Sequence, residues 1–134
     1  MMLWNETMLV GIPHIDSQHK ALLEAINQLI DACNKGKGRS EIEQTLNFMV
    51  SYTKGHFKDE ERYQETHAYA GAAAHKRMHT HFIMRVGGLV QEFNENGPSV
   101  TLVSKINNLL IEWVDNHIKT EDRKFGDYIN RKSA

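Results

Sequence analysis

A single cysteine, Cys33, occurs in this chain of 134 residues. One thiol cannot form an intrachain disulfide, and it excludes a zinc or iron–sulfur site built from several cysteines. No apolar run approaches the roughly 18 residues that a membrane-spanning helix needs. The first residues also lack the basic and apolar regions of a secretory signal peptide. We therefore expect a cytoplasmic protein that does not bind a membrane.

Charge of one sign is also missing, since 16 basic and 17 acidic residues give a net charge of -1. Sequence-independent binding of nucleic acid requires a strongly basic face, so nucleic acid is not an expected partner. The length predicts one domain spanning residues 1–134. The sequence leaves open whether this domain is a whole protein or part of a longer one, and it identifies no protein partner.

Strand signals are almost absent, whereas four segments have helical periodicity and are separated by short stretches that contain glycine or proline. Short connections favour antiparallel neighbours, so the predicted fold is all-α, an up-down-up-down four-helix bundle. Ser40 and Ser99 are expected N-caps, as is Asp16 or Ser17. The predicted elements are an N-terminal arm at 1–13, bundle helices at 17–34, 40–66, 72–95 and 99–118, and a short helix at 121–130.

The arm offers Trp4, Leu9, Val10 and Ile12 to pack across the bundle. Each long helix carries an inward stripe that is apolar except at one end. In an antiparallel bundle, the starts of the first and third helices lie beside the ends of the second and fourth. Polar members of all four stripes therefore converge at one end of the interior. These six residues are His19, His56, Glu60, His75, His79 and His117, and the carboxylate of Asp122 follows five residues after His117.

Histidines and carboxylates are costly to bury unless they pair or bind metal, so this cluster predicts a metal site. The set offers enough nitrogen and oxygen ligands for two ions. His56 and Glu60 are four residues apart, so one helix can give a nitrogen to one ion and a carboxylate that reaches the other. His75 and His79 have the same spacing and can serve one ion.

The last two candidates, His117 and Asp122, are five residues apart, which places them about 140° from one another on an ideal α-helix. Both can face one site only if the helix ends, bulges or kinks between them, and we predict such a break at 118–121. Glu121 is the alternative ligand, because its spacing of four from His117 suits an uninterrupted helix.

The order and separation of these motifs resemble those of bacterial hemerythrin domains. The matching pieces are Trp4 with Gly11-Ile12, Ile15-Asp16-Ser17-Gln18-His19-Lys20, His56-Phe57-x-x-Glu60-Glu61, His75-x-x-x-His79-x-x-Phe82 and Trp113-x-x-x-His117-Ile118-x-x-x-Asp122. The resemblance covers nearly the whole chain. It implies a non-haem pair of iron ions with an oxo or hydroxo bridge.

The resemblance also implies a role for each ligand. His75, His79 and His117 would hold one iron, while His19 and His56 would hold the other, which keeps an open position. Glu60 and Asp122 would bridge the two ions, so the resemblance favours Asp122 over Glu121.

The function implied is reversible binding of dioxygen, for transport, storage or sensing, rather than enzymatic turnover. The alternatives are a di-iron enzyme acting on peroxide or nitric oxide, and an iron-buffering or iron-sensing protein. Oxygen binding also requires a dry pocket. Its candidate walls are Leu22, Leu23, Phe57, Phe82, Trp113 and Ile118.

Several other polar residues are expected to lie outside the site. Of the remaining histidines, one precedes the first helix, one lies in the connection after the second helix, and one lies on the face of the third helix that points away from the site. Two acidic residues beside Glu60 lie off its stripe and are expected to be solvated, and the lone thiol is expected to be inert. These residues are His14, His67, His81, Asp59, Glu61 and Cys33.

Overall fold

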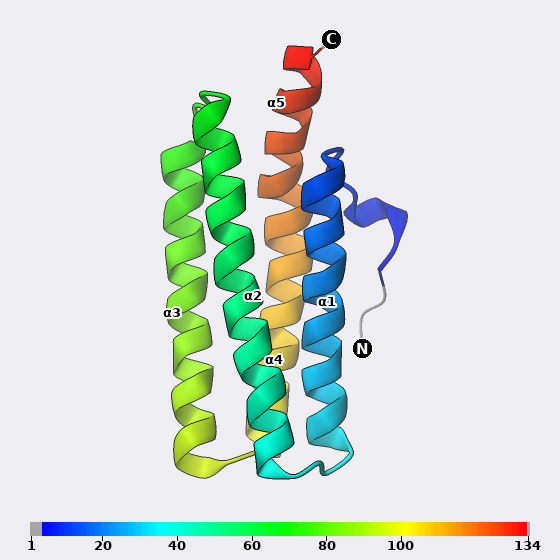
Figure 1. Ribbon diagram of the computed structural model, residues 1–134, viewed down its shortest axis with the longest axis vertical. Coiled ribbons are helices and arrows are strands. Elements are labelled where there is room, and N and C mark those ends of the chain that lie inside the picture. Colours follow the sequence, from blue (N-terminus) through cyan, green and yellow to red (C-terminus); the bar gives the residue numbers. More distant parts are fainter. Residues whose placement is uncertain (1–3, 134) are drawn as a thin grey trace.

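The computed structural model describes residues 4–133, so residues 1–3 of the predicted arm lie outside the described part. Helices α1 (Pro13–Asn34), α2 (Arg39–Thr66), α3 (Ala72–Asn96) and α4 (Val100–Ile111) run up and down in turn (Figure 1). Helix α1 packs against α2 and α4, and α3 packs against the same two helices. The described residues contain no strand. The predicted four-helix bundle is therefore confirmed.

The fourth helix does not stop at the end of α4. It continues through η2 (Glu112–Asp122), a π-helix, into α5 (Arg123–Ser133). Figure 1 shows these elements as one rod that runs the length of the bundle and projects beyond it. The predicted C-terminal helix is present, but the break predicted at 118–121 is a change of helix type and not an interruption.

The predicted start of α1 at residue 17 is wrong, because the helix begins at Pro13, a residue whose fixed φ suits the first helical position. Neither Asp16 nor Ser17 caps it. The Asp16 carboxylate instead accepts hydrogen bonds from the backbone N–H groups of Val10 (2.7 Å) and Gly11 (3.2 Å). Asp16 thus ties the N-terminal arm to α1.

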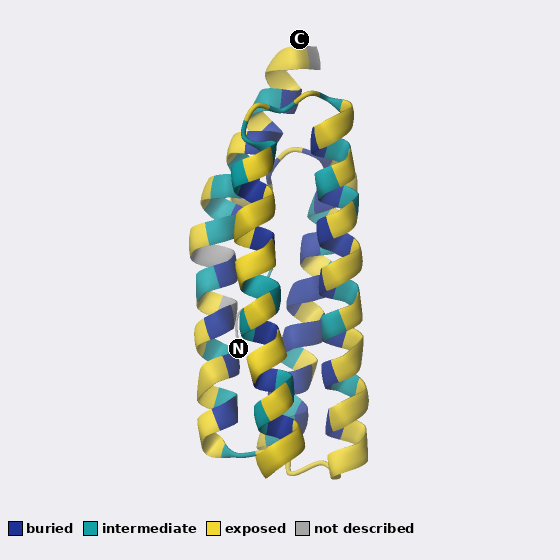
Figure 2. Cartoon of the chain, turned by 90° about the vertical axis from the view of Figure 1, so that its left-hand side faces the viewer, coloured by how far each residue is buried: buried dark blue, intermediate teal, exposed yellow. Residues whose placement is uncertain are grey.

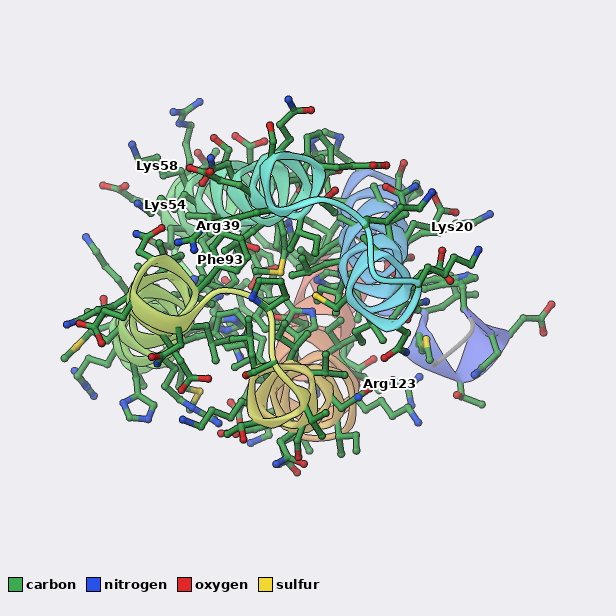
Figure 3. All side chains as sticks on the ribbon, turned by 90° about the horizontal axis from the view of Figure 1, so that it is seen from below. Lys20, Arg39, Lys54, Lys58, Phe93 and Arg123 are labelled. Carbon is green, nitrogen blue, oxygen red and sulfur yellow. The ribbon has the colours of Figure 1, made fainter. Side chains whose placement is uncertain are left out.

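The other two predicted caps have opposite outcomes. Ser99 caps α4, since its hydroxyl accepts a hydrogen bond from the N–H of Leu102 at 3.0 Å. Ser40 does not cap α2, which begins at Arg39 without a side-chain cap. The Arg39 guanidinium reaches the last turn of α3 and donates to the carbonyl of Asn94 at 2.8 Å (Figure 3).

The described part of the arm contains the short helix η1 (Glu6–Met8) and buries Val10, whereas Leu9 is 43% exposed and does not pack inward as expected. Arg123 lies between α5 and the arm (Figure 3) and donates to the carbonyl of Thr7 at 2.7 Å. Gly126 allows this approach, because a Cβ there would lie 1.8 Å from the carbonyl oxygen of Val10. The arm therefore closes over the C-terminal rod.

Buried residues follow the inward face of the bundle helices, and residues on the outer faces are exposed (Figure 2). Aliphatic and aromatic groups such as Leu29, Ile42 and Phe93 fill the end of the bundle near the α1–α2 connection. At the other end the core is polar. No helix among residues 4–133 is long and apolar enough to cross a membrane.

Candidate metal centre

All seven residues singled out by the sequence meet at the polar end of the core. Helix α1 contributes one of them, and α2, α3 and η2 contribute two each. Six are at most 2% exposed, and the side chain of His117 is 12% exposed. The members are His19, His56, Glu60, His75, His79, His117 and Asp122.

These residues form two overlapping groups that can hold a metal ion, and within each group the candidate ligand atoms lie within 4.8 Å of one another. Glu60 and Asp122 belong to both groups. The first group adds His75, His79 and His117, and the second adds His19 and His56. Two neighbouring positions with shared carboxylates are the arrangement of a bridged pair of ions.

The two oxygens of Glu60 face different groups. Oε1 lies 2.6 Å from Nε2 of His75 and 3.4 Å from Nε2 of His79, both in the first group. Oε2 lies 3.4 Å from Nε2 of His56 and 3.8 Å from Nε2 of His19, both in the second. The carboxylate therefore spans the two positions.

Asp122 divides its oxygens in the same way. Oδ1 lies 2.8 Å from Nε2 of His75 and 3.2 Å from Nε2 of His117, and Oδ2 lies 3.0 Å from Nε2 of His19. The π-helix explains how Asp122 reaches this place beside His117. Its backbone hydrogen bonds join residues five apart, so residues at that spacing lie nearly above one another.

The facing atoms lie close together without hydrogen bonds of ordinary geometry. Nε2 of His56, Nε2 of His79, both Glu60 oxygens and both Asp122 oxygens are buried without a hydrogen-bond partner. Buried polar atoms in such numbers are costly, and a cation among them would satisfy all of them. Nitrogen and oxygen donors of these types suit iron and other transition metals, so the residues fit an iron pair.

Electrostatics also distinguish the histidines. Burial alone lowers the pKa of His19, but its contacts with Asp122 and Glu60 outweigh burial and raise it to about 9. The same balance raises the pKa of His75 to about 10. Burial, assisted by the charge of His19, lowers the pKa of His56 to about 4.

The two carboxylates stay ionised. Burial and the neighbouring Asp122 raise the pKa of Glu60, but its close polar contacts with histidines including His19 and His75 prevail and lower it to about 2. Burial likewise opposes ionisation of Asp122, and His117 contributes most to holding its pKa well below the ordinary value. Without metal, protons on His19 and His75 therefore balance the two carboxylates, and metal would displace them.

A second layer of residues holds the outer nitrogens of three histidines. Nδ1 of His56 donates to Oε1 of Gln18 at 2.7 Å, and Nδ1 of His79 donates to Oε2 of Glu61 at 2.8 Å. Nδ1 of His75 lies 3.0 Å from the amide nitrogen, Nε2, of Gln64. The acceptor oxygens of Gln18 and Glu61 fix the rings of His56 and His79 and leave their Nε2 atoms for metal.

The sequence interpretation missed these partners. Glu61 was expected to be solvated, but it is only 24% exposed and binds His79. Asp59 is 43% exposed and accepts a hydrogen bond from Gln18 at 2.8 Å, so it is also not simply solvated. One available signal was Gln64, which continues the inward stripe of α2 one turn beyond Glu60.

Aromatic rings cover the groups. The ring of Phe57 stacks on His79 with centroids 3.9 Å apart, and Trp113 stacks on His117 at 4.7 Å. Phe82 contacts Trp113 at 4.7 Å and, with Trp113 and His117, lines a cavity of about 540 Å³ between α3 and η2. The remaining expected walls are buried, and their contact with oxygen stays a prediction. They are Leu22, Leu23 and Ile118.

The residues expected outside the site are absent from both groups. His81 is exposed and His67 is half-buried. His14 is largely exposed and lies 3.9 Å from Asp59. Burial raises the pKa of the Cys33 thiol, which favours its unreactive form. Glu121 also lies outside both groups and contacts Lys124 at 3.4 Å.

Comparison with known proteins decides the family. Residues 10–129 match the family model described as the Hemerythrin HHE cation binding domain. The chain belongs to the hemerythrin family. A bacteriohemerythrin of Pseudomonas aeruginosa is 35% identical over 133 residues, which cover 99% of this chain and 84% of the relative.

More distant hemerythrins agree in sequence and in fold. A myohemerythrin of Theromyzon tessulatum is 29% identical over 91% of this chain and 88% of its own length. The crystal structure of a wild-type hemerythrin superposes with a TM-score of 0.79 at 26% identity, covering 95% of this chain and 96% of the other. The hemerythrin fold thus extends over nearly all of the chain.

Proposed function

We propose that this chain binds dioxygen reversibly at a pair of non-haem iron ions. The observation that carries the proposal is the division of the Glu60 and Asp122 oxygens between two groups of histidines. Membership of the hemerythrin family supports the same function. When bound, the iron pair would supply the electrons that hold dioxygen.

The two positions are unequal in nitrogen donors. His75, His79 and His117 would hold one ion, and His19 and His56 would hold the other. Because the second group offers one histidine fewer, an ion held there would keep an open position, which is where we expect dioxygen to bind. Glu60 and Asp122 would bridge the ions together with an oxo or hydroxo oxygen. Five neutral imidazoles and only two carboxylates donate less charge than carboxylate-rich di-iron sites, which favours binding over oxidation of a substrate.

The protein's own contribution beyond the ligands is to exclude water. Phe57 and Trp113 are at most 3% exposed, and both lie beside His56, with ring centroids 5.8 Å and 6.0 Å away; the Trp113 ring also lies 6.2 Å from that of His19. A dry site protects bound dioxygen from the proton transfers that would release reduced oxygen species. Transport, storage and sensing all require this chemistry, and the cytoplasmic location stays a prediction.

The test is anaerobic reduction of the purified protein, followed by air and then by degassing, with visible absorption and iron content recorded at each step. We expect two irons per chain and an absorption band that appears with oxygen and disappears on degassing. His56→Ala is expected to lose the second iron, whereas His81→Ala, on the outer face of α3, is expected to leave the spectrum unchanged.

Each alternative function predicts another result. Repeated turnover of peroxide or nitric oxide would indicate an enzyme, and loosely held, exchangeable iron would indicate iron buffering. A folded, iron-supplied protein without a bound pair would contradict the proposal.

A further inference from the structure

Two contacts fix the ring of His79. Its Nδ1 donates to Oε2 of Glu61 at 2.8 Å, and the Phe57 ring lies parallel to it, with an interplanar angle of 3° and centroids 3.9 Å apart. Together these contacts set both the plane of the imidazole and its rotation in that plane. Nε2 then points into the site, 3.4 Å from Oε1 of Glu60.

Glu61 differs in charge from the equivalent partners of the other histidines. The groups at Nδ1 of His56 and His75 are the neutral amides of Gln18 and Gln64. A carboxylate draws the Nδ1 proton more strongly than an amide does, and this makes Nε2 a better electron donor. Of the three partners, only Glu61 is a carboxylate, and the histidine it contacts, His79, belongs to the group with three histidines.

The surroundings of Glu61 allow it to be replaced without emptying the core. It is 24% exposed and is one of the residues that line a cavity of about 690 Å³ between the end of α2 and the start of α3. Glu65, one turn further along α2, lines the same cavity but is exposed and is not among the residues that contact His79. Glu65 is therefore a matched control for charge and location.

We propose that Glu61 is a positioning residue for the metal centre. It fixes the tautomer and orientation of His79 and makes the ion held by three histidines the more electron-rich member of the pair. The inference rests on the proposed function, because it concerns one of the proposed iron ligands.

The first experiment measures Zn²⁺ affinity in chelator-stripped protein by competition with a coloured chelator, so it does not depend on iron or oxygen. We expect Glu61→Ala to weaken binding about 10–100-fold, the range found for losing such a partner. Glu61→Gln should lose less, because its amide oxygen still accepts the Nδ1 proton. Glu65→Ala and Glu65→Gln should bind as the wild type does.

As a control, melting curves of the metal-free variants are recorded to check that each variant is folded. Wild-type Zn²⁺ affinity in Glu61→Ala, or an equal loss in Glu65→Ala, would overturn the positioning role.

The second experiment measures the reduction potential of the iron-loaded protein. Glu61→Gln should raise it, because the neutral amide donates less charge through His79, and Glu65→Gln should leave it unchanged. An unchanged potential in Glu61→Gln would overturn the electronic part of the proposal. The two proposals can also fail separately. If Zn²⁺ affinity falls from wild type to Glu61→Gln to Glu61→Ala but the wild type binds no iron pair, the proposed function is contradicted and the role of Glu61 is supported.

Discussion

The site histidines use their two ring nitrogens for different purposes. In His56 and His79, Nδ1 donates outward to Gln18 and Glu61, while Nε2 is buried without a hydrogen-bond partner. The spacing of the histidines predicts the inward nitrogens, since the stripe of each helix follows from the sequence. The outward partners depend on how neighbouring helices are rotated, which local periodicity does not specify.

Asp122 and Glu121 are adjacent carboxylates with different surroundings. Asp122 is 1% exposed and belongs to both metal-compatible groups, whereas the Glu121 side chain is 27% exposed and belongs to neither. We expect Asp122→Ala to remove a bridge and lower the iron content to one ion per chain or fewer. Glu121→Ala should retain two. Atomic emission analysis of both variants checks this, and the reverse result would transfer the bridging role to Glu121.

The raised pKa values of His19 and His75 predict how the metal-free protein responds to alkali. Both values lie above the ordinary 6.5, at about 9 and about 10. The stability that they contribute is therefore fully present below pH 6.5 and is lost as pH rises through the folded-state values. We expect the free energy of unfolding to fall between pH 7 and pH 10, as measured by urea titration.

On the acid side, His56 has the opposite effect. Its pKa of about 4 in the folded protein lies below the ordinary 6.5, so the folded state binds this proton more weakly and stability falls between pH 6.5 and pH 4. Glu60, with its pKa lowered to about 2, adds a loss below about pH 4.5. The metal-free protein should thus be most stable near pH 6.5. An alkaline decline of equal size in iron-loaded protein would contradict this account, because metal occupies the same nitrogens.

At the scale of the element, η2 gives the fourth helix two functions. The α-helical part before it packs the core with Leu102 and Ile106, and the π-helical part brings His117 and Asp122 to one face. The spacing of five predicts that regular α-helix is lost between them. It does not predict that the departure extends over Glu112–Asp122 or that α5 follows without interruption.

The number of residues between His117 and Asp122 in η2 can be changed to test whether the π-helix is needed. Deleting Thr120, an exposed residue of η2, reduces the spacing to four, so an ordinary α-helix would place both ligands on one face. We expect this variant to keep two irons. Inserting an alanine after Thr120 gives a spacing of six, which turns the carboxylate away. The insertion variant is therefore expected to lose iron. Iron analysis and circular dichroism check both variants. Loss of iron in the deletion variant as well would show that the π-helix itself is required.

The whole molecule separates its packing from its chemistry. The end of the bundle near the α1–α2 connection holds an apolar core, and the other end holds eight buried polar residues among those that the structure describes. The apolar end does not depend on metal, so we expect the helices to persist without it. At the polar end, a bound cation is needed to compensate the buried nitrogen and oxygen atoms that lack hydrogen-bond partners.

Metal removal should therefore lower the melting temperature but leave the helix content nearly unchanged. A ligand present at about 1,000 times its Kd contributes about 4 kcal/mol. For a domain of this size that corresponds to a fall of roughly 15 °C. Circular dichroism melts of iron-loaded and chelator-treated protein measure the difference. Equal midpoints would mean that the seven residues are compensated without metal.

The sequence by itself determined the four inward stripes, the end at which their polar members meet and six of the seven residues, because helical period is a local property and short connections favour antiparallel neighbours. The choice of Asp122 over Glu121 came from the resemblance to hemerythrins and not from spacing. Only the tertiary structure decided which oxygen of Glu60 faces which histidine, that Glu61 lies against His79 and that the arm crosses Gly126. These contacts join elements far apart in the chain. They depend on the rotation and axial position of each packed helix, which local sequence patterns do not fix.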